Sequence, residues 1–286
     1  MKLQVIHRTI YAYSKPVSLC HNVAHLSARA TAQQTPLHRE LEVQPSPRSF
    51  ATFTDFFGNA AHFFSVEESH QQLSVTAAQT VEVTPHSTVD PGVSPPWEEA
   101  RTSSSKSLEV HPFTLASTYI KPFAEIAAYA LVSFRPGRRM LDAALELTRR
   151  IHEEFEYDPN ATTISTPVQE VLERRRGVCQ DFAHLEISCL RSLGLAARYV
   201  SGYLRTLPPP GEPRLVGADA THAWVSVYCP SLGWVDLDPT NNLIPSEGHV
   251  LLAHGRDFDD VTPIKGVILG GGEHSVAVSV DVCPVP

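Results

Sequence analysis

The hydrophobic period of the sequence changes twice along the chain, and this order limits the fold more than any single motif. Over residues 1–85, apolar and polar residues alternate, as in Val81-Glu82-Val83, and turn residues such as Gly58-Asn59 separate the alternating segments. Between residues 122 and 194, apolar residues recur every three or four positions, as in helices. Alternation then returns in three segments: residues 197–204, 222–229 and 233–237. Strands followed by helices and then antiparallel strands predict an α+β protein.

The two kinds of pattern also predict two domains. Short, evenly spaced strands in residues 1–88 are typical of a small β-sandwich. Residues 86–96 are rich in Pro, Ser, Thr and Gly, which is typical of a stiff linker. We therefore expect a β-rich domain at 1–88 and a second domain, which would carry any active site, at 89–286. We expect Gly270-Gly271-Gly272 to form a loop or hairpin near the C-terminus.

The composition argues against several classes of protein. The 286 residues carry a formal net charge of −8 without a long Lys/Arg run, so we expect no nucleic-acid partner. No apolar stretch reaches the length of about 18 residues that a membrane span needs, so we expect no membrane partner. Residues 1–13 alternate like a strand and do not resemble a secretory signal. Five scattered cysteines without a CxxC pair favour a reduced, cytoplasmic protein without a disulfide framework.

Histidine is frequent, with 14 residues, which raises the question of a metal site. The HExxH motif is absent, and the nearest approach to it is His184-Leu185-Glu186. We therefore expect no metal and no other cofactor. A His-rich metal protein is the weakest alternative, and metal analysis of the untagged protein would test it.

Cys179 lies where a cysteine becomes nucleophilic. Gly177 breaks the chain, and Cys179 then opens a helical pattern that ends near Gly194. A helix N-terminus favours the thiolate over the thiol, because its unpaired amides and dipole stabilise negative charge. The same amides can stabilise the oxyanion formed when sulfur attacks a carbonyl group. The residue pattern therefore makes Cys179 a candidate nucleophile.

His222 and a following aspartate complete the candidate set. His222 opens the strand 222–229, and a short turn at residues 230–233 leads into the strand Trp234–Leu237. Two adjacent antiparallel strands can place a carboxylate beside His222, where it would orient the imidazole. Asp236 and Asp238 both qualify, because residues two apart in a strand face the same side. The strand-end position of Asp238 favours it only slightly.

Three motifs resemble the transglutaminase-like superfamily of bacterial thiol enzymes. They are GVCQDFAHL at 177–185, ARYVSGYL at 197–204 and THAWVSVYCPSLGWVDLDPTN at 221–241. FEYDPNATT at 155–163, HGRDFDDVTPIKGVILGGG at 254–272 and the N-terminal DFFGN at 55–59 are also similar to this family. The resemblance covers nearly the whole chain. It implies a papain-like core preceded by a β domain, and a catalytic triad of Cys179, His222 and Asp238.

The resemblance implies acyl transfer through a thioester on a peptide or protein amide substrate. It does not choose between hydrolysis of an amide, peptide or isopeptide bond and glutamine cross-linking; we expect hydrolysis, because cross-linking requires a site that excludes water. Around the triad, Tyr157 is a candidate for the pocket rim and Gln180 for an oxyanion donor, although the backbone amide is the better donor. Trp224 is expected in the core, with the acyl pocket as the alternative.

A structural role is the simpler interpretation for several other residues. We expect Cys20, Cys189 and Cys229 to be structural, and His184 to be packed inside the protein. The alternative from a different class of function is a non-catalytic binding or scaffold protein that keeps the enzyme fold and whose β-rich domain docks a protein partner. The presence of all three triad residue types argues against it, and the reactivity of the Cys179 thiol discriminates between the two classes. The sequence does not indicate an oligomeric state.

Overall fold

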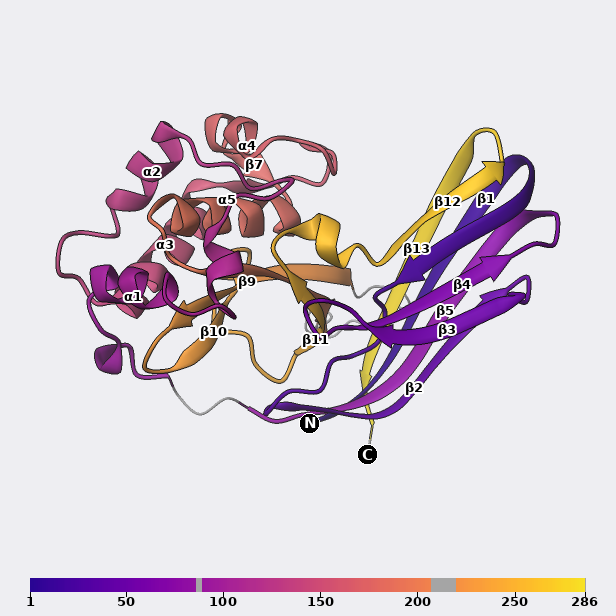
Figure 1. Cartoon of the computed structure of the whole chain (residues 1–286), viewed down its shortest axis with the longest axis horizontal. Helices are drawn as coiled ribbons and strands as arrows, with labels where there is room; N and C mark the ends of the chain where they lie inside the picture. Colours follow the sequence, from indigo (N-terminus) through magenta and orange to yellow (C-terminus); the bar gives the residue numbers. More distant parts are fainter. Residues whose placement is uncertain (86–88, 207–219, 286) are drawn as a thin grey trace, which may run out of the picture.

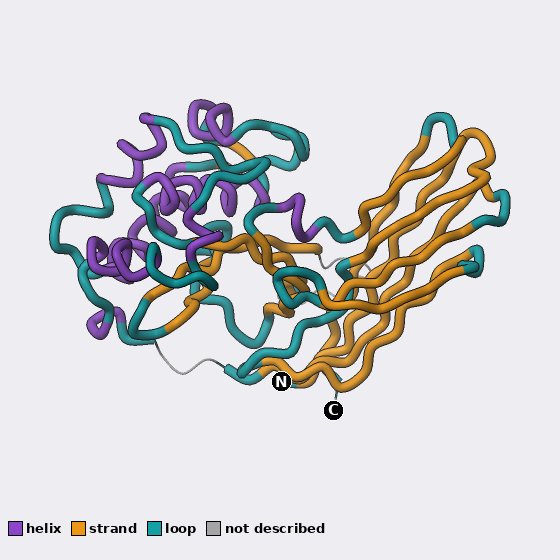
Figure 2. Tube along the Cα trace, in the orientation of Figure 1, coloured by secondary structure: helices purple, strands orange, loops and turns teal. Residues whose placement is uncertain are grey.

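The structure consists of a β-rich part and a part in which helices pack on a smaller sheet (Figure 1). It is a computed structural model that describes residues 1–85, 89–206 and 220–285. Within these residues, no helix is both long and apolar enough to cross a membrane. Figure 2 shows that the helices gather at one end of the molecule, whereas the β-rich part is built from strands and loops. This architecture confirms the α+β class.

The β-rich part contains strands from both ends of the chain. They are β1 (Lys2–Ala24), β2 (Gln34–Gln44), β3 (Ser49–Thr54), β4 (Ala60–Val66), β5 (His70–Val83), β12 (Ile264–Gly270) and β13 (His274–Pro284). β1 is the central strand. Its first half pairs with β5 and β13, and its second half with β4 and β12.

β1 bends between its two halves, at the end of the molecule farthest from the helices (Figure 1). Buried side chains from both halves of β1 and from β2, β4 and β5 form one apolar cluster, which shows that the halves enclose a common core. Its members are Tyr13, Val17, Cys20, Ala24, Leu26, Val43, Phe64, Val66, Leu73, Val75 and Ala77. This is the arrangement expected of a small β-sandwich.

The C-terminal strands differ from the expected division after residue 88. That division assigns residues 264–284 to the second domain, whereas β12 and β13 pair with β1 and complete the sheet of the first part. Alternation predicts that a segment is a strand, but the partner of a strand is a non-local property. Gly270, Gly271 and Gly272 have φ angles of 100°, 88° and 64° and form the break between two strands that both pair with β1.

The second part contains the helices and a four-stranded antiparallel sheet in the order β10-β9-β8-β11. Its helices are α1 (Trp97–Ser104), α2 (Ala124–Leu131), α3 (Met140–Glu154), α4 (Val168–Arg174) and α5 (Cys179–Ser192). Its strands are β6 (Glu156–Tyr157), β7 (Arg176–Gly177), β8 (Ala197–Leu204), β9 (Ala220–Cys229), β10 (Gly233–Leu237) and β11 (His249–Gly255). Short 3₁₀ helices form at Pro91–Val93, His111–Thr114 and Phe258–Val261.

The apolar faces of the central helices form the core between helices and sheet. On α3, residues such as Leu141, Ala144, Leu147 and Ile151 are fully buried at the spacing that the sequence predicts. α5 is buried along nearly its whole length and packs on β8 and β9. This burial fixes the first turn of α5 relative to the sheet.

Part of the expected linker and the polar segment after it is ordered. Residues 86–88 lie outside the described residues, but Ser94 is fully buried and its hydroxyl oxygen accepts a hydrogen bond from the Leu141 amide. Residues 97–104 form α1, which buries Trp97 and Ala100. The sequence analysis missed α1, because four of its eight residues are short polar or basic types that masked the spacing of the buried ones.

Two side-chain amides of the β-rich part hold the edge strand β11. Gln34 donates from Nε2 to the Leu251 carbonyl oxygen at 2.7 Å and accepts from the Leu251 amide at 2.8 Å. Asn59 donates from Nδ2 to the His254 carbonyl oxygen at 2.9 Å and accepts from the His254 amide at 3.0 Å. Each amide satisfies the backbone of β11 as a neighbouring strand would. The β-rich part thereby covers an edge of the second sheet.

Candidate active site

The first turn of α5 presents Cys179 in a partly exposed position. The preceding Val178 has an extended backbone, and its amide donates to Asp181 Oδ2 at 2.8 Å. Asp181 thus reaches back over the helix start, as an acidic residue at this position often does. The Thr162 hydroxyl also donates to this oxygen, at 2.6 Å, and ties the loop before α4 to the helix start. Cys179 is therefore held on a fixed first turn.

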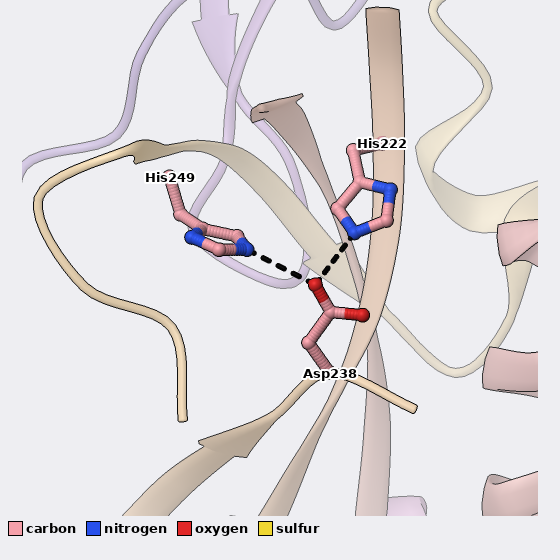
Figure 3. A group of neighbouring side chains, drawn as sticks. All are labelled: His222, Asp238 and His249. Carbon is pink, nitrogen blue, oxygen red and sulfur yellow. Dashed lines mark hydrogen bonds and ion pairs between the residues drawn. The ribbon is translucent and has the colours of Figure 1, made fainter. Parts of the chain in front are cut away.

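His222 and Asp238 meet where β9 and β10 run side by side. His222 is near the start of β9, and Asp238 directly follows β10, which pairs with β9 up to Leu237 and Val225. His222 Nε2 lies 2.8 Å from Asp238 Oδ2 (Figure 3). Both side chains are buried, with exposed fractions of 6% and 0%. The imidazole thus uses Nε2 for the carboxylate, and Nδ1 is the nitrogen left for another partner.

The charges in this group support one another. Burial by itself lowers the pKa of His222, but hydrogen bonds to Asp238 and Cys179 and the charge on both residues raise it to about 9. Burial by itself raises the pKa of Asp238, but hydrogen bonds from His222, His249 and Asn241 hold it well below its usual range. The carboxylate is therefore ionised and the imidazole is protonated at neutral pH. The structure brings Cys179, His222 and Asp238 into one interacting set.

Asp238 accepts hydrogen bonds at both of its oxygens. Besides His222, Oδ2 accepts from Asn241 Nδ2 at 2.7 Å and from His249 Nε2 at 3.1 Å. Oδ1 accepts from the amides of Thr240 and Asn241 at 3.0 and 3.1 Å. The sequence analysis missed His249, because a single histidine before a short strand carries no local signal. Asn241 lies inside the DPTN motif, but it was not singled out.

The rival aspartate has a different role. Asp236 Oδ2 accepts from the indole Nε1 of Trp224 at 3.0 Å. Trp224 is buried and packs beside both His222 and His249, with ring-centre distances of 6.0 and 5.3 Å. Trp224 is thus a core aromatic behind the imidazoles. Gly202 on β8 leaves room for it, because a Cβ at this position would lie 2.4 Å from the indole.

The other expected site residues lie around the helix start. Tyr157 is 54% exposed, and partial burial together with the charge of the nearby Cys179 raises its pKa. The side chain of Gln180 donates to the Ile164 carbonyl oxygen at 3.3 Å. That contact favours the backbone amide over the side chain as an oxyanion donor. His184 is buried, accepts from the Phe258 amide and stacks on Tyr119.

The remaining cysteines do not share the environment of Cys179. All five cysteines lie in the described residues, and none forms a disulfide bond with another. Cys20, Cys189 and Cys229 are buried, and burial raises the pKa of Cys189 well above its ordinary value. Cys283 is half-buried on β13.

A metal ion could in principle use the same polar atoms. His222, Asp238 and His249 offer ligand atoms that all lie within 4.8 Å of one another. A carboxylate only accepts, so both Nε2 atoms carry protons as they stand. Metal binding would require both imidazoles to lose these protons and both hydrogen bonds to break. The geometry is that of a hydrogen-bonded group.

Comparisons with known proteins agree with the geometry. The family model described as the transglutaminase-like superfamily matches residues 131–239, which contain Cys179, His222 and Asp238. The model described as the bacterial transglutaminase-like N-terminal region matches residues 3–82. The chain belongs to the transglutaminase-like superfamily. Members of this superfamily share the papain-like core, so the expected fold is confirmed.

Relatives of this superfamily member match over different lengths. The uncharacterized protein Rv2569c of Mycobacterium tuberculosis is 41% identical over 292 residues, which cover 99% of this chain and 93% of the relative. A protein-glutamine gamma-glutamyltransferase of Pseudomonas aeruginosa is 38% identical over 127 residues, which cover 43% of this chain and 19% of that protein. A crystal structure from Cytophaga hutchinsonii, described as a candidate cysteine protease, has a TM-score of 0.76 at 24% identity. It covers 99% of this chain and 90% of its own.

Proposed function

We propose that the protein is a thiol-dependent hydrolase of an amide, peptide or isopeptide bond, with Cys179, His222 and Asp238 as its catalytic triad. The observation that carries the proposal is the hydrogen bond of 2.8 Å between His222 and Asp238, made by an imidazole that also interacts with Cys179. A nucleophile, a base and an orienting carboxylate in this order form the arrangement that activates a thiol.

Each residue has a defined step. The Cys179 thiolate attacks the carbonyl carbon, and the electron pair of the C=O bond moves to oxygen. The Cys179 amide at the start of α5 donates to this oxyanion. The tetrahedral intermediate expels the amine, which takes its proton from His222, and a thioester remains. Water then attacks the thioester, gives a proton to His222, and Cys179 departs as the thiolate, so that the triad is restored.

Hydrolysis is favoured over amine transfer by the openness of the site. Cys179 is partly exposed, and the nearby Tyr157 is 54% exposed, so water reaches the thioester. Cross-linking through a second amine is the alternative, and the similarity to the Pseudomonas aeruginosa enzyme supports it. Five cysteines that form no disulfide bond with one another suit a reducing compartment, and we place the reaction in the cytoplasm as part of this proposal.

Thiol reactivity tests the proposal without a known substrate. We would measure the rate of alkylation by iodoacetamide at each cysteine as a function of pH, by mass spectrometry. We expect Cys179 to react at least about tenfold faster than half-buried Cys283 at pH 7, and His222→Ala to slow Cys179 alone. Equal, slow labelling of both cysteines would contradict the proposal and favour a scaffold whose β-rich part docks a protein partner.

The fate of the thioester separates the two reactions. A glutamine-containing peptide would be incubated with the protein, with and without a fluorescent primary amine. Hydrolysis predicts ammonia release and a glutamate product whether or not the amine is present. Incorporation of the amine as the main product would favour cross-linking. Cys179→Ala should abolish either product, and Cys283→Ala is the matched cysteine control.

A further inference from the structure

Two imidazoles hold the same carboxylate oxygen. Asp238 Oδ2 lies 2.8 Å from His222 Nε2 and 3.1 Å from His249 Nε2, and it lies between the two rings (Figure 3). The oxygen belongs to an ionised carboxylate, which can only accept, so both nitrogens donate. The tautomer of His249 follows from this requirement. Its N–H competes with that of His222 for one oxygen and at the same time fixes where the oxygen lies.

His249 is itself held rigidly. Its side chain is 7% exposed, and its ring packs edge-on against Trp224 at 5.3 Å between ring centres. Trp224 is fixed in turn by its hydrogen bond to Asp236. Two residues along β11 from His249, the backbone of Leu251 is clamped by Gln34 of the β-rich part. The second imidazole thus rests on an edge strand whose position depends on both parts of the molecule.

We propose that His249 is a positioning residue of the triad, whose Nε2–H fixes the Asp238 oxygen that orients His222. This inference rests on the proposed function. In Figure 3, His249 and His222 approach the same carboxylate oxygen from different directions, with ring centres 5.8 Å apart; the hydrogen bond of His249 goes to the carboxylate, so it acts through Asp238. The amides of Thr240 and Asn241 already hold Oδ1. His249 and Asn241 both donate to Oδ2 and fix its position. His222 Nε2 donates to the oxygen at this position, so His222 Nδ1 points away from the carboxylate.

The other titratable groups around Asp238 come from the packed elements on several sides. His222 lies on β9, His249 on β11, and Cys179 and Glu186 on α5. Glu186 is fully buried, and its Oε1 accepts from the Thr148 hydroxyl at 2.7 Å and not from either imidazole. A His249 substitution therefore removes the hydrogen bond from β11 to Asp238 and the ring contacts with Trp224 and His222, and it leaves the Glu186 hydrogen bond in place.

The test compares four proteins by the rate at which iodoacetamide labels Cys179 at pH 7. They are the wild type, His249→Leu, His249→Gln and His254→Leu. Leucine removes the donor, whereas glutamine can still offer an N–H near the place of Nε2. His254 is the matched control, because it is equally buried on β11 but pairs with Arg198. The urea midpoint of each protein reports its stability separately.

We expect His249→Leu to label Cys179 about tenfold more slowly. His249→Gln should remain within about threefold of the wild type, and His254→Leu should label at the wild-type rate even where its urea midpoint falls.

Three results would overturn the inference: wild-type labelling in His249→Leu, equal slowing in His254→Leu, or no rescue by glutamine. Failure of the proposed function itself is distinguishable. In that case Cys179 of the wild type reacts no faster than Cys283, and His222→Ala changes nothing.

Discussion

At the scale of single residues, burial and hydrogen bonding give two carboxyl groups different protonation states. Asp238 is fully buried but surrounded by donors, which keep it ionised, and it in turn keeps His222 protonated. Glu186 on α5 is equally buried. Its Oε1 accepts a hydrogen bond from the Thr148 hydroxyl, and its Oε2 has no partner. Burial, reinforced by the charge of Asp238, raises the pKa of Glu186 to about 8.

The pKa of His222 is the first prediction at this scale. Nitrogen-15 NMR of labelled histidine should show His222 titrating near pH 9, because Asp238 and Cys179 both favour its protonated form. Asp238→Asn removes a charge and should lower this midpoint by at least about one unit. Cys283→Ala is the control and should leave the midpoint unchanged. An unchanged midpoint in Asp238→Asn would mean that the carboxylate does not control the imidazole.

The second prediction concerns Glu186. Its pKa rises from 4.5 to about 8 on folding, so the folded state holds a proton that the unfolded state releases between these values. The free energy of unfolding therefore falls as pH rises through this window and levels off above pH 8. Glu186→Gln removes this loss, so the variant should exceed the wild type by about 1–3 kcal/mol at pH 9 and match it near pH 4.

Urea unfolding at pH 4, 6.5 and 9 measures this difference. Glu173→Gln, on the exposed face of α4, is the matched control and should follow the wild type at each pH. A stability difference for Glu186→Gln that does not grow with pH would show that Glu186 is already ionised in the folded protein.

At the scale of elements, the site depends on where helices and strands begin and end. Cys179 is the first residue of α5, Asp238 follows the last residue of β10, and His249 is the first residue of β11. Ends of elements combine a fixed backbone with free polar groups, which is why site residues gather there. The position of β11, which begins at His249, also depends on the β-rich part. The side-chain amides of Gln34 and Asn59 hold the backbone of β11 from outside its sheet.

The clamp on β11 gives a prediction at this scale. Gln34→Ala leaves the partly buried N–H of Leu251 without its partner and removes one of the two hydrogen bonds to its C=O, the other coming from the Arg29 amide, which should cost about 1–3 kcal/mol of unfolding free energy. The same change should slow the labelling of Cys179, because β11 carries His249. Gln72→Ala, at an exposed position of β5, is the control for both measurements. A loss of stability without slower labelling would separate the clamp from the triad.

Elements with a complete local pattern could be predicted, and those defined by distant partners could not. α3, α5, β8, β9 and β10 each carry their own periodicity, and the motifs on them identified Cys179, His222 and Asp238. Periodicity alone did not separate Asp236 from Asp238, since the choice depends on which donor each one meets, Trp224 or His222. His249 escaped notice because its role arises only when β11 joins the sheet. The partner of β13 is likewise set by β1, at the other end of the chain.

At the scale of the whole molecule, the β-rich part and the helical part are joined by a common apolar core and by the hydrogen bonds that hold β11. Leu3 and Val5 of β1 and Val280 and Val282 of β13 belong to the same apolar cluster as the helices around Cys179. The β-rich part therefore contributes to the core of the other part. Because the two parts are continuous, the sequence pattern showed where strands give way to helices, but it did not show that β12 and β13 return to the first sheet.

Removal of the C-terminal strands tests this unity. A chain that ends at Pro263 lacks β12 and β13 and leaves one edge of β1 unpaired along most of its length. We expect it to aggregate, or to lose its cooperative thermal transition and the fast labelling of Cys179. Size-exclusion chromatography, circular dichroism and alkylation against the full-length protein measure these effects. A soluble monomer with full labelling would show that the part that carries Cys179 folds without β12 and β13.

The pairing of β13 with β1 also has a consequence for biosynthesis. Residues 3–13 are synthesised long before their partners at 274–284. Multidomain chains commonly fold their N-terminal domain while the rest is still being translated. Here the first sheet stays open along one edge of β1 until β12 and β13 have been made. A chain that stops before these strands carries an exposed strand edge that the quality-control machinery of the cell can recognise.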